Sequence, residues 1–249
     1  MSIFDSDDFN DRLFYPRSDS SAPPLGATDH FVDVDGARLH LRIHPGGAAC
    51  RLLLLFHGNG EVVADYDALA ARFAAAHTRL AVVDYRGYGL SSGVPSLRAV
   101  MDDAPIVATF VAGLEAGPVI VMGRSLGSAC AHDLIAAGDA APSAFILDSG
   151  FSDLAGLVAR RGMSCPHLSA QERTRFDPLL KIKRLKRPIL IVHGEDDTLI
   201  SCEEARVLFD ATSYPDRRLA IIPDFGHNDL FASPSYWSVL SEFVGSLSP

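Results

Sequence analysis

One serine in the sequence lies where a nucleophile of acyl-transfer chemistry is expected. Ser125 is the centre of 123-GRSLG-127, which follows the apolar run PVIVM and precedes the helix-like segment LGSACAHDLIAA. A Gly-x-Ser-x-Gly sequence between a strand and a helix forms a turn so tight that glycines are required, and it exposes the hydroxyl at the edge of the sheet. We therefore predict that Ser125 is a nucleophile, rather than only a turn residue or a helix cap.

A serine hydroxyl needs a general base to become a nucleophile at neutral pH. His227, in 223-PDFGHNDL-230, follows the last expected strand and precedes the last expected helix, so it should lie on a loop at the carboxyl edge of a sheet. It is our candidate for the base. The other histidines fall on early strands, in helices, in a charged insertion or at strand ends, where packing and surface roles are more common: His30, His40, His44, His57, His77, His132, His167 and His193.

A carboxylate is needed to orient the imidazole and to stabilise its charged form. The stretch 191-IVHGEDDTLIS-201 contains Glu195, Asp196 and Asp197 after an apolar run, and it lies between Ser125 and His227 in the chain. The order serine, acid, histidine favours this cluster, but it does not choose among the three neighbours. Asp148, at the end of the preceding strand, is an alternative acid.

The oxyanion of a tetrahedral intermediate needs hydrogen-bond donors. The backbone N–H of Leu126, the residue after the nucleophile, is one expected donor. The segment 56-FHGNG-60 directly follows a strand, and the backbone N–H of Asn59 is our candidate for the second. The alternative is that His57 and Gly58 only shape a tight loop.

These residues require a sheet whose strands end at one edge. Two alternating runs, 29–34 and 37–43, flank Asp35-Gly36 and predict an antiparallel hairpin. Continuous apolar runs then alternate with helical segments, which is typical of a parallel sheet covered on both faces. The runs are 51–56, 80–85, 118–123, 144–148, 188–193 and 218–223, and the helices are expected at 64–77, 97–114, 126–138, 202–212 and 234–244.

Two segments fall outside this alternation. Residues 1–28 are rich in Asp, Ser and Pro without periodicity, so we expect a surface arm, with ordered structure beginning near Asp29. Residues 149–187 form a longer, charged insertion, which we interpret as a small lid at the carboxyl edge of a single domain spanning 29–249.

Composition excludes several classes of function. A net charge of −9 and a pI near 5.4 argue against binding to nucleic acid. No apolar run is long enough for a membrane span, and the acidic N-terminus does not resemble a signal peptide. The four cysteines show neither C-x-x-C nor metal-ligand spacing, which favours a reducing, cytoplasmic location. We expect no metal or organic cofactor, and the pattern predicts no particular oligomeric state.

The sequence resembles the α/β-hydrolases from about residue 29 onward, and most closely their serine aminopeptidase-like, or hydrolase-4-like, branch, which includes protein depalmitoylases. The segments that carry the resemblance are FHGNG, DYRGYGLSSG, GRSLGS, FDPLLKIKRLKRPILIVHGEDDTLIS and GHNDL. The family's H-G-x-x-D pattern, matched to 193-HGEDD-197, implies that Asp197 is the acid.

The resemblance also implies the fold and the reaction. The fold would be a mostly parallel eight-stranded sheet with helices on both faces and a small lid. The reaction would be hydrolysis of a small-molecule carboxylic ester or thioester through a Ser-His-Asp triad and an acyl-enzyme. Branch members that act on lipidated proteins carry an N-terminal cysteine cluster or a membrane anchor, whereas residues 1–28 contain no cysteine. The alternatives are a peptidase, amidase or acyltransferase with the same triad, or a binding protein that kept the fold without catalysis.

Overall fold

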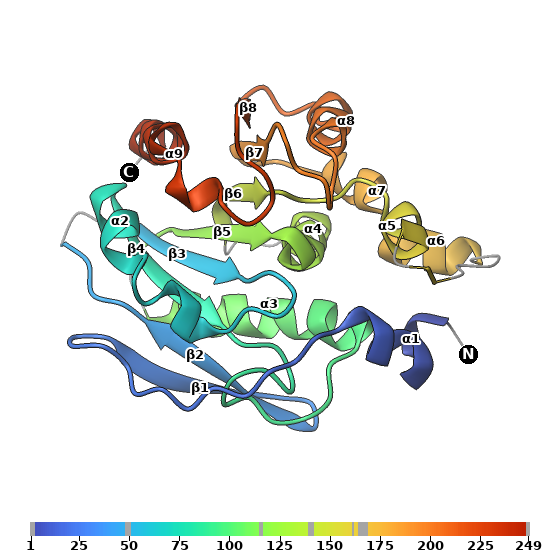
Figure 1. Cartoon of the computed structure of the whole chain (residues 1–249), viewed down its shortest axis with the longest axis horizontal. Helices are drawn as coiled ribbons and strands as arrows, with labels where there is room; N and C mark the ends of the chain where they lie inside the picture. The colour runs from blue at the N-terminus through green and yellow to red at the C-terminus, as the bar shows by residue number, and fades with distance from the viewer. Residues whose placement is uncertain are drawn as a thin grey trace.

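The protein is built on one eight-stranded sheet. The computed structural model describes residues 3–47, 51–114, 117–138, 142–160, 162–163 and 169–247. The strands are β1 (Thr28–Val34), β2 (Ala37–Ile43), β3 (Arg51–Phe56), β4 (Thr78–Val83), β5 (Val119–Arg124), β6 (Pro142–Asp148), β7 (Ile189–Gly194) and β8 (Arg217–Ile222). Their order is β1-β2-β4-β3-β5-β6-β7-β8, as Figure 1 shows.

The sheet has the strand directions that the apolar runs predict. The β1–β2 and β2–β4 pairs are antiparallel, and every other neighbouring pair is parallel. The six strands from β3 to β8 therefore end at one edge, where ligands bind in open α/β sheets. The predicted fold class and the hairpin at 29–43 are confirmed.

Helices cover both faces of the sheet (Figure 1). A core of buried side chains lies between one face and α3, α4 and α8, and a second core lies between the other face and α2 and α9. The helices are α2 (Ala70–Ala75), α3 (Leu97–Leu114), α4 (Ser128–Ala137), α8 (Glu203–Ala211) and α9 (Pro234–Ser246). No helix among the described residues is long and apolar enough to cross a membrane.

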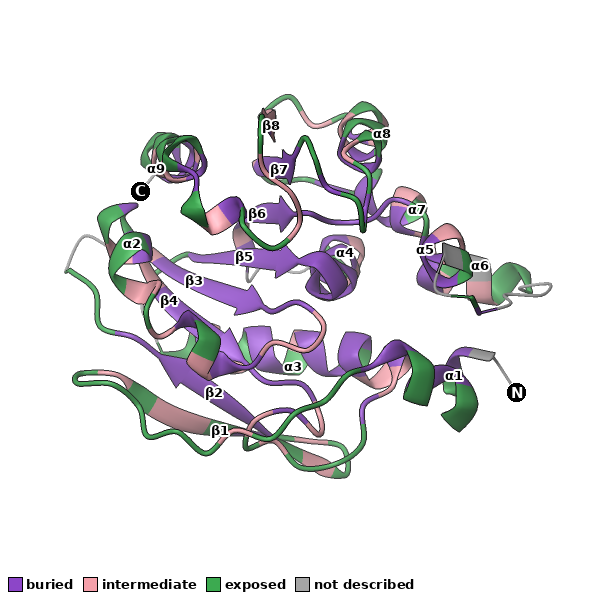
Figure 2. Cartoon of the chain, viewed as in Figure 1, coloured by how far each residue is buried: buried purple, intermediate pink, exposed green. Residues whose placement is uncertain are grey.

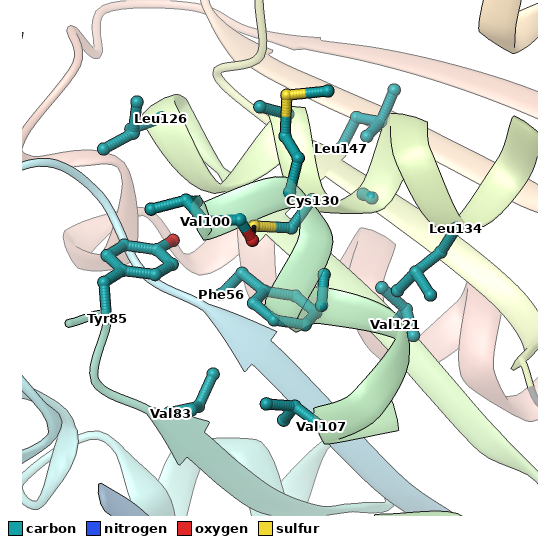
Figure 3. Close-up of a cluster of buried hydrophobic side chains, with 14 of the residues drawn as sticks. Phe56, Val83, Tyr85, Val100, Val107, Val121, Leu126, Cys130, Leu134 and Leu147 are labelled. Atoms are coloured by element: carbon teal, nitrogen blue, oxygen red, sulfur yellow. Dashed lines mark hydrogen bonds between the residues drawn. The ribbon is translucent and has the colours of Figure 1, made fainter. Parts of the chain in front are cut away.

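The helix that follows Ser125 is fixed by apolar packing. Figure 3 shows Cys130 and Leu134 of α4 in one cluster with Phe56 and Val121 of the central strands and with Val107 of α3. These side chains are buried, and each buried aliphatic or aromatic side chain contributes about 1.5–3 kcal/mol. α4 ends at Ala137 and is capped by Gly138 at φ 69°, which agrees with the end of the helix expected at 126–138.

The helix expected at 64–77 is shorter than predicted. The chain instead forms a 3-10 turn at Val63–Tyr66 and the short helix α2. Polar contacts hold the turn, because the Val63 N–H donates to Asp84 Oδ1 at 3.0 Å and the Val62 N–H donates to Asp65 Oδ2 at 3.0 Å. One local and one tertiary hydrogen bond thus override the helical periodicity of the segment.

The prediction that ordered structure begins near Asp29 is wrong. A 3-10 turn (Ile3–Asp5) and helix α1 (Asp7–Leu13) precede the first strand, and Ser6 caps α1 through the Phe9 N–H. Phe4, Phe9, Leu13 and Phe14 are buried in the same core as α3 and α4. Figure 2 shows buried, purple stretches of the chain next to exposed, green ones near α1. The segment is therefore part of the folded body.

Replacing Leu13 by alanine is expected to lower the free energy of unfolding by about 2–5 kcal/mol, because a fully buried leucine leaves a cavity. The matched control is Leu25→Ala, since Leu25 lies on the same segment and is fully exposed. Its effect should stay within about 0.5 kcal/mol. Urea unfolding checks both variants, and equal midpoints would contradict the packing of α1 on the core.

The described part of the segment 149–187 contains three short helices: α5 (Leu154–Arg160), α6 (Ala170–Phe176) and α7 (Pro178–Ile182). Glu204 on α8 anchors its beginning, because its Oε2 accepts hydrogen bonds from the Ser152 N–H and hydroxyl, both at 2.7 Å. His167 lies outside the described residues. That this segment acts as a lid stays a prediction.

Candidate active site

The turn that carries Ser125 is forced by close backbone contacts. A side chain at Gly127 would overlap the carbonyl of Phe56 at the end of β3, and a Cβ on Gly123 would lie 2.5 Å from the carbonyl oxygen of Gly127. Ser125 itself has φ 50°, a left-handed conformation that is strained for a serine. Such strain persists only where the surroundings impose it, and here it presents the hydroxyl at the carboxyl edge of the sheet.

Three side chains predicted from sequence lie in one hydrogen-bonded row. His227 lies on the loop between β8 and α9, and its Nε2 is 2.9 Å from Ser125 Oγ. Its Nδ1 is 2.6 Å from Oδ2 of Asp197, which follows β7. With the proton on Nδ1, the ring donates to the carboxylate and leaves Nε2 to accept the serine proton. The row can therefore take a proton from the Ser125 hydroxyl.

Asp197 is the member of the acidic cluster that faces the histidine. Its side chain is fully buried, whereas Glu195 and Asp196 are exposed. Its Oδ1 accepts the backbone N–H groups of Leu199 at 2.9 Å and Ile200 at 2.8 Å. The geometry thus distinguishes Asp197 from Glu195 and Asp196, a choice that chain order alone left open.

The pKa of Asp197 is held well below its usual range. Burial by itself would raise this pKa, but hydrogen bonds from His193, His227 and the Ile200 N–H stabilise the charged form more strongly. The carboxylate is therefore ionised at every pH near neutrality, so a loss of activity at mildly acidic pH would have to come from another group.

The alternative acid, Asp148, is occupied elsewhere. Its Oδ1 accepts from Arg124 at 3.2 Å, and its Oδ2 accepts from the Tyr236 hydroxyl at 2.8 Å. His193 lies behind the row, where its Nε2 is 2.8 Å from the Ile200 carbonyl and 3.1 Å from Asp197. The structure brings neither Asp148 nor His193 to Ser125.

The candidate oxyanion loop is a tight turn next to Ser125. The Glu61 N–H donates to the Gly58 carbonyl at 3.3 Å, and Gly60 has φ 82°, which is the glycine position of a type II turn. Asn59 is the other central residue of this turn. The His57 ring is buried, with its Nδ1 2.7 Å from the Gly58 carbonyl oxygen and its Nε2 3.4 Å from Asp84 Oδ1, so its contacts shape the loop.

The N-terminal segment contacts this turn, which the sequence did not suggest. The Asn59 side-chain amide donates to the Leu13 carbonyl at 2.5 Å, and its Oδ1 accepts from the Tyr15 N–H at 2.9 Å and the Tyr88 hydroxyl at 2.7 Å. The only signals in residues 1–28 were the capping serine Ser6 and the apolar residues spaced four apart, Phe9 and Leu13.

Two charged residues beside the row were also missed. Arg124 and Glu61 form an ion pair at 3.0 Å, with the arginine side chain buried. Burial disfavours ionisation of Glu61, yet Arg124 and the Tyr66 hydroxyl bring the pKa of this carboxyl below its usual range. The sequence signal that could have pointed to Arg124 was the presence of a charged residue in an otherwise apolar strand. Among the described residues, no group of three His, Cys, Asp or Glu side chains is placed to hold a metal ion.

The sequence is similar to a family model and to proteins of other organisms. Residues 47–165 match a family model described as serine aminopeptidase, S33. The chain is 26% identical over 231 residues to the Escherichia coli protein YfhR, with 88% of this chain and 80% of that protein covered. It is 31% identical over 202 residues to alpha/beta hydrolase domain-containing protein 17B of Xenopus laevis. This match covers 77% of this chain and 65% of that protein.

The fold has a close counterpart among solved structures. An esterase of Pyrococcus furiosus, Pf2001, superposes with a TM-score of 0.77 at 16% identity, covering 95% of this chain and 98% of the esterase. The sheet order and this superposition give the chain the α/β-hydrolase fold. In sequence, the chain is similar to the serine aminopeptidase family over residues 47–165, just under half of its length.

Proposed function

We propose that the protein is a serine hydrolase that cleaves carboxylic esters or thioesters. The observation that carries the proposal is the continuous hydrogen-bonded row from Ser125 through His227 to Asp197, with contacts of 2.9 Å and 2.6 Å. Such a row is the arrangement that turns a hydroxyl into a nucleophile.

The reaction would proceed in two halves. Ser125 Oγ attacks the acyl carbon while His227 Nε2 accepts its proton. The imidazolium then protonates the leaving oxygen or sulfur as its bond to the acyl carbon breaks, and the alcohol or thiol departs. Water, deprotonated by His227, attacks the acyl-enzyme, and the bond from the acyl carbon to Oγ breaks to release the acid while the imidazolium returns a proton to Oγ. Asp197 holds the ring and stabilises its charged form through both halves.

Two backbone N–H groups are available for the oxyanion. Among the described residues, neither the Asn59 N–H nor the Leu126 N–H is hydrogen-bonded to another protein group. Both follow neighbouring strands, since Phe56 at the end of β3 pairs with Gly123 near the end of β5. A preorganised donor of this kind contributes about 3–4 kcal/mol to stabilisation of the transition state.

Esters and thioesters are favoured over amides because an alkoxide or a thiolate is a far better leaving group than the anion of an amine, whose nitrogen must be protonated before it departs. The substrate we propose is a small-molecule ester or thioester, with no nucleic acid partner and no cofactor. Cys130 and Cys202 carry free thiols, while Cys50 and Cys165 lie outside the described residues. The cytoplasm stays our proposed location on the basis of cysteine usage.

The substrate class is tested by a hydrolysis panel. p-Nitrophenyl esters of increasing acyl length, acyl-CoA thioesters and the matched p-nitroanilides are assayed side by side, with labelling by a fluorophosphonate in parallel. We expect turnover of an ester or thioester and no detectable turnover of the anilide. Preference for the anilide would make the protein an amidase or peptidase. Absence of both turnover and labelling would favour a binding protein that kept the fold.

A further inference from the structure

The residue before Ser125 connects parts of the site that are far apart in the sequence. Arg124 ends β5, and only 3% of its side chain is exposed. Its three guanidinium nitrogens donate to three different acceptors: Nε to Glu61 Oε1 at 3.0 Å, Nη1 to Asp148 Oδ1 at 3.2 Å and Nη2 to the carbonyl of His227 at 2.9 Å. One rigid group therefore contacts two loops and the end of β6 at the carboxyl edge of the sheet.

The first contact reaches the candidate oxyanion turn. Glu61 uses Oε1 for Arg124, and its Oε2 accepts the Gly58 N–H at 2.6 Å and the Tyr66 hydroxyl at 2.5 Å. Gly58 and Glu61 are the two ends of the turn that contains Asn59. The position of the Asn59 N–H thus depends on a carboxylate that Arg124 holds in place.

The second contact acts on the candidate base. The bond from Arg124 fixes the backbone carbonyl of His227, the residue whose ring lies between Ser125 and Asp197. Phe231, further along the same loop, packs against the guanidinium with its ring centroid 5.0 Å away. Arg124 is adjacent to Ser125 in sequence, so it ties the nucleophile's own strand to the loop that carries the base.

A second buried arginine provides a control, which distinguishes the contacts of Arg124 with the site from simple compensation of buried charge. Arg42 on β2 is also fully buried, and it also binds two carboxylates and one carbonyl, those of Asp29, Asp67 and Ser21. None of these three partners belongs to the proposed site. A lysine can replace the charge of either arginine, but its ammonium cannot reproduce a planar fork of three separate donors.

We propose that Arg124 is a positioning residue for the hydrolytic reaction, which holds the oxyanion turn through Glu61 and the base through the His227 carbonyl. The inference rests on the proposed serine hydrolase function. Arg124 does not touch the reacting atoms, so its loss should slow the chemical step while substrate binding stays intact.

The matched variants Arg124→Lys and Arg42→Lys test the proposal on a p-nitrophenyl ester, with kcat, KM and Tm measured for each. Displacement of a catalytic group by about 1 Å costs about 100-fold in rate. We expect Arg124→Lys to lower kcat by about that factor with KM changed by less than about threefold. Arg42→Lys should lower Tm comparably and leave kcat within about threefold. Equal effects of the two variants on kcat, or an unchanged kcat in Arg124→Lys, would overturn the proposal.

Glu61→Gln supplies a second, independent test, which can be carried out even if Arg124→Lys folds poorly. Glutamine keeps the shape of the side chain but weakens its charge-assisted bonds, so kcat should fall about tenfold. If Arg124 acts through Glu61, the double variant should be no more than about threefold slower than Arg124→Lys alone. An unchanged kcat in Glu61→Gln, or fully multiplicative effects in the double variant, would remove the route through the oxyanion turn.

Assaying Ser125→Ala alongside separates the two proposals. An inactive Ser125→Ala together with an unaffected Arg124→Lys would remove only the positioning role. Retained turnover in Ser125→Ala would remove the serine hydrolase mechanism, and the role of Arg124 with it.

Discussion

Replacement of Ser125 by alanine is expected to lower kcat for an ester substrate by about 10⁴- to 10⁶-fold, with the fold intact. The reason is that, among the described residues, Ser125 has the only hydroxyl within hydrogen-bonding distance of His227 Nε2. The residual turnover of this variant would come from substrate binding and from the oxyanion donors alone. Steady-state kinetics on a p-nitrophenyl ester measures the loss, and thermal unfolding shows that the variant is folded.

Ser128→Ala is the matched control. Ser128 is also buried and lies one turn along, and its hydroxyl donates to the Ser125 carbonyl at 2.7 Å, so its removal deletes one hydroxyl beside the site without touching the row. The hydrogen bond is worth about 0.5–1.5 kcal/mol, which limits the effect to about tenfold. Turnover by Ser125→Ala at a level similar to that of Ser128→Ala would exclude Ser125 as the nucleophile.

Asp197→Asn is expected to lower kcat by about 10⁴-fold. The amide has one acceptor oxygen where the carboxylate offers two to His227, His193, Leu199 and Ile200. It also carries an NH₂ group that favours the wrong tautomer of the His227 ring. Kinetics on the same ester measures the effect.

Asp196→Asn is the control because it changes the adjacent carboxylate in the same way. Asp196 is exposed, and its backbone N–H, not its side chain, holds the loop by donating to the Phe225 carbonyl at 2.9 Å. Its activity should stay within about twofold of the wild type. A larger loss in Asp196→Asn than in Asp197→Asn would reverse the assignment of the acid.

The sheet was predictable because its signals are local. Each strand from β3 to β7 is a short, mostly apolar run whose residues are almost all buried, and this pattern is local to each strand. β8, at the edge of the sheet, is apolar after its first two residues and only half-buried. The same reasoning failed at 64–77, where helical periodicity is real but the contacts of Asp84 and Asp65 hold the backbone in a 3-10 turn. Hydrophobic periodicity predicts which residues are buried. It does not predict the polar hydrogen bonds that decide whether the backbone forms a 3-10 turn or an α-helix.

The site was only partly predictable for a related reason. Motif context placed Ser125 and His227 at the carboxyl edge, and the family spacing pointed to Asp197. Arg124 and Glu61 could not be paired from sequence, because 63 residues separate them and their contact depends on the order β3-β5 in the sheet. The contact between the N-terminal segment and Asn59 was hidden likewise, since the composition of residues 1–28 is polar while Phe4, Phe9 and Leu13 are buried.

The measurement that tests the central proposal most directly is mass spectrometry of the protein after reaction with a fluorophosphonate. Such a probe phosphonylates a serine only where a base and oxyanion donors activate it. We expect one adduct on the intact protein, located by peptide mapping to Ser125 and absent from Ser125→Ala. An adduct on another residue, or none on a protein that hydrolyses esters, would contradict Ser125 as the nucleophile.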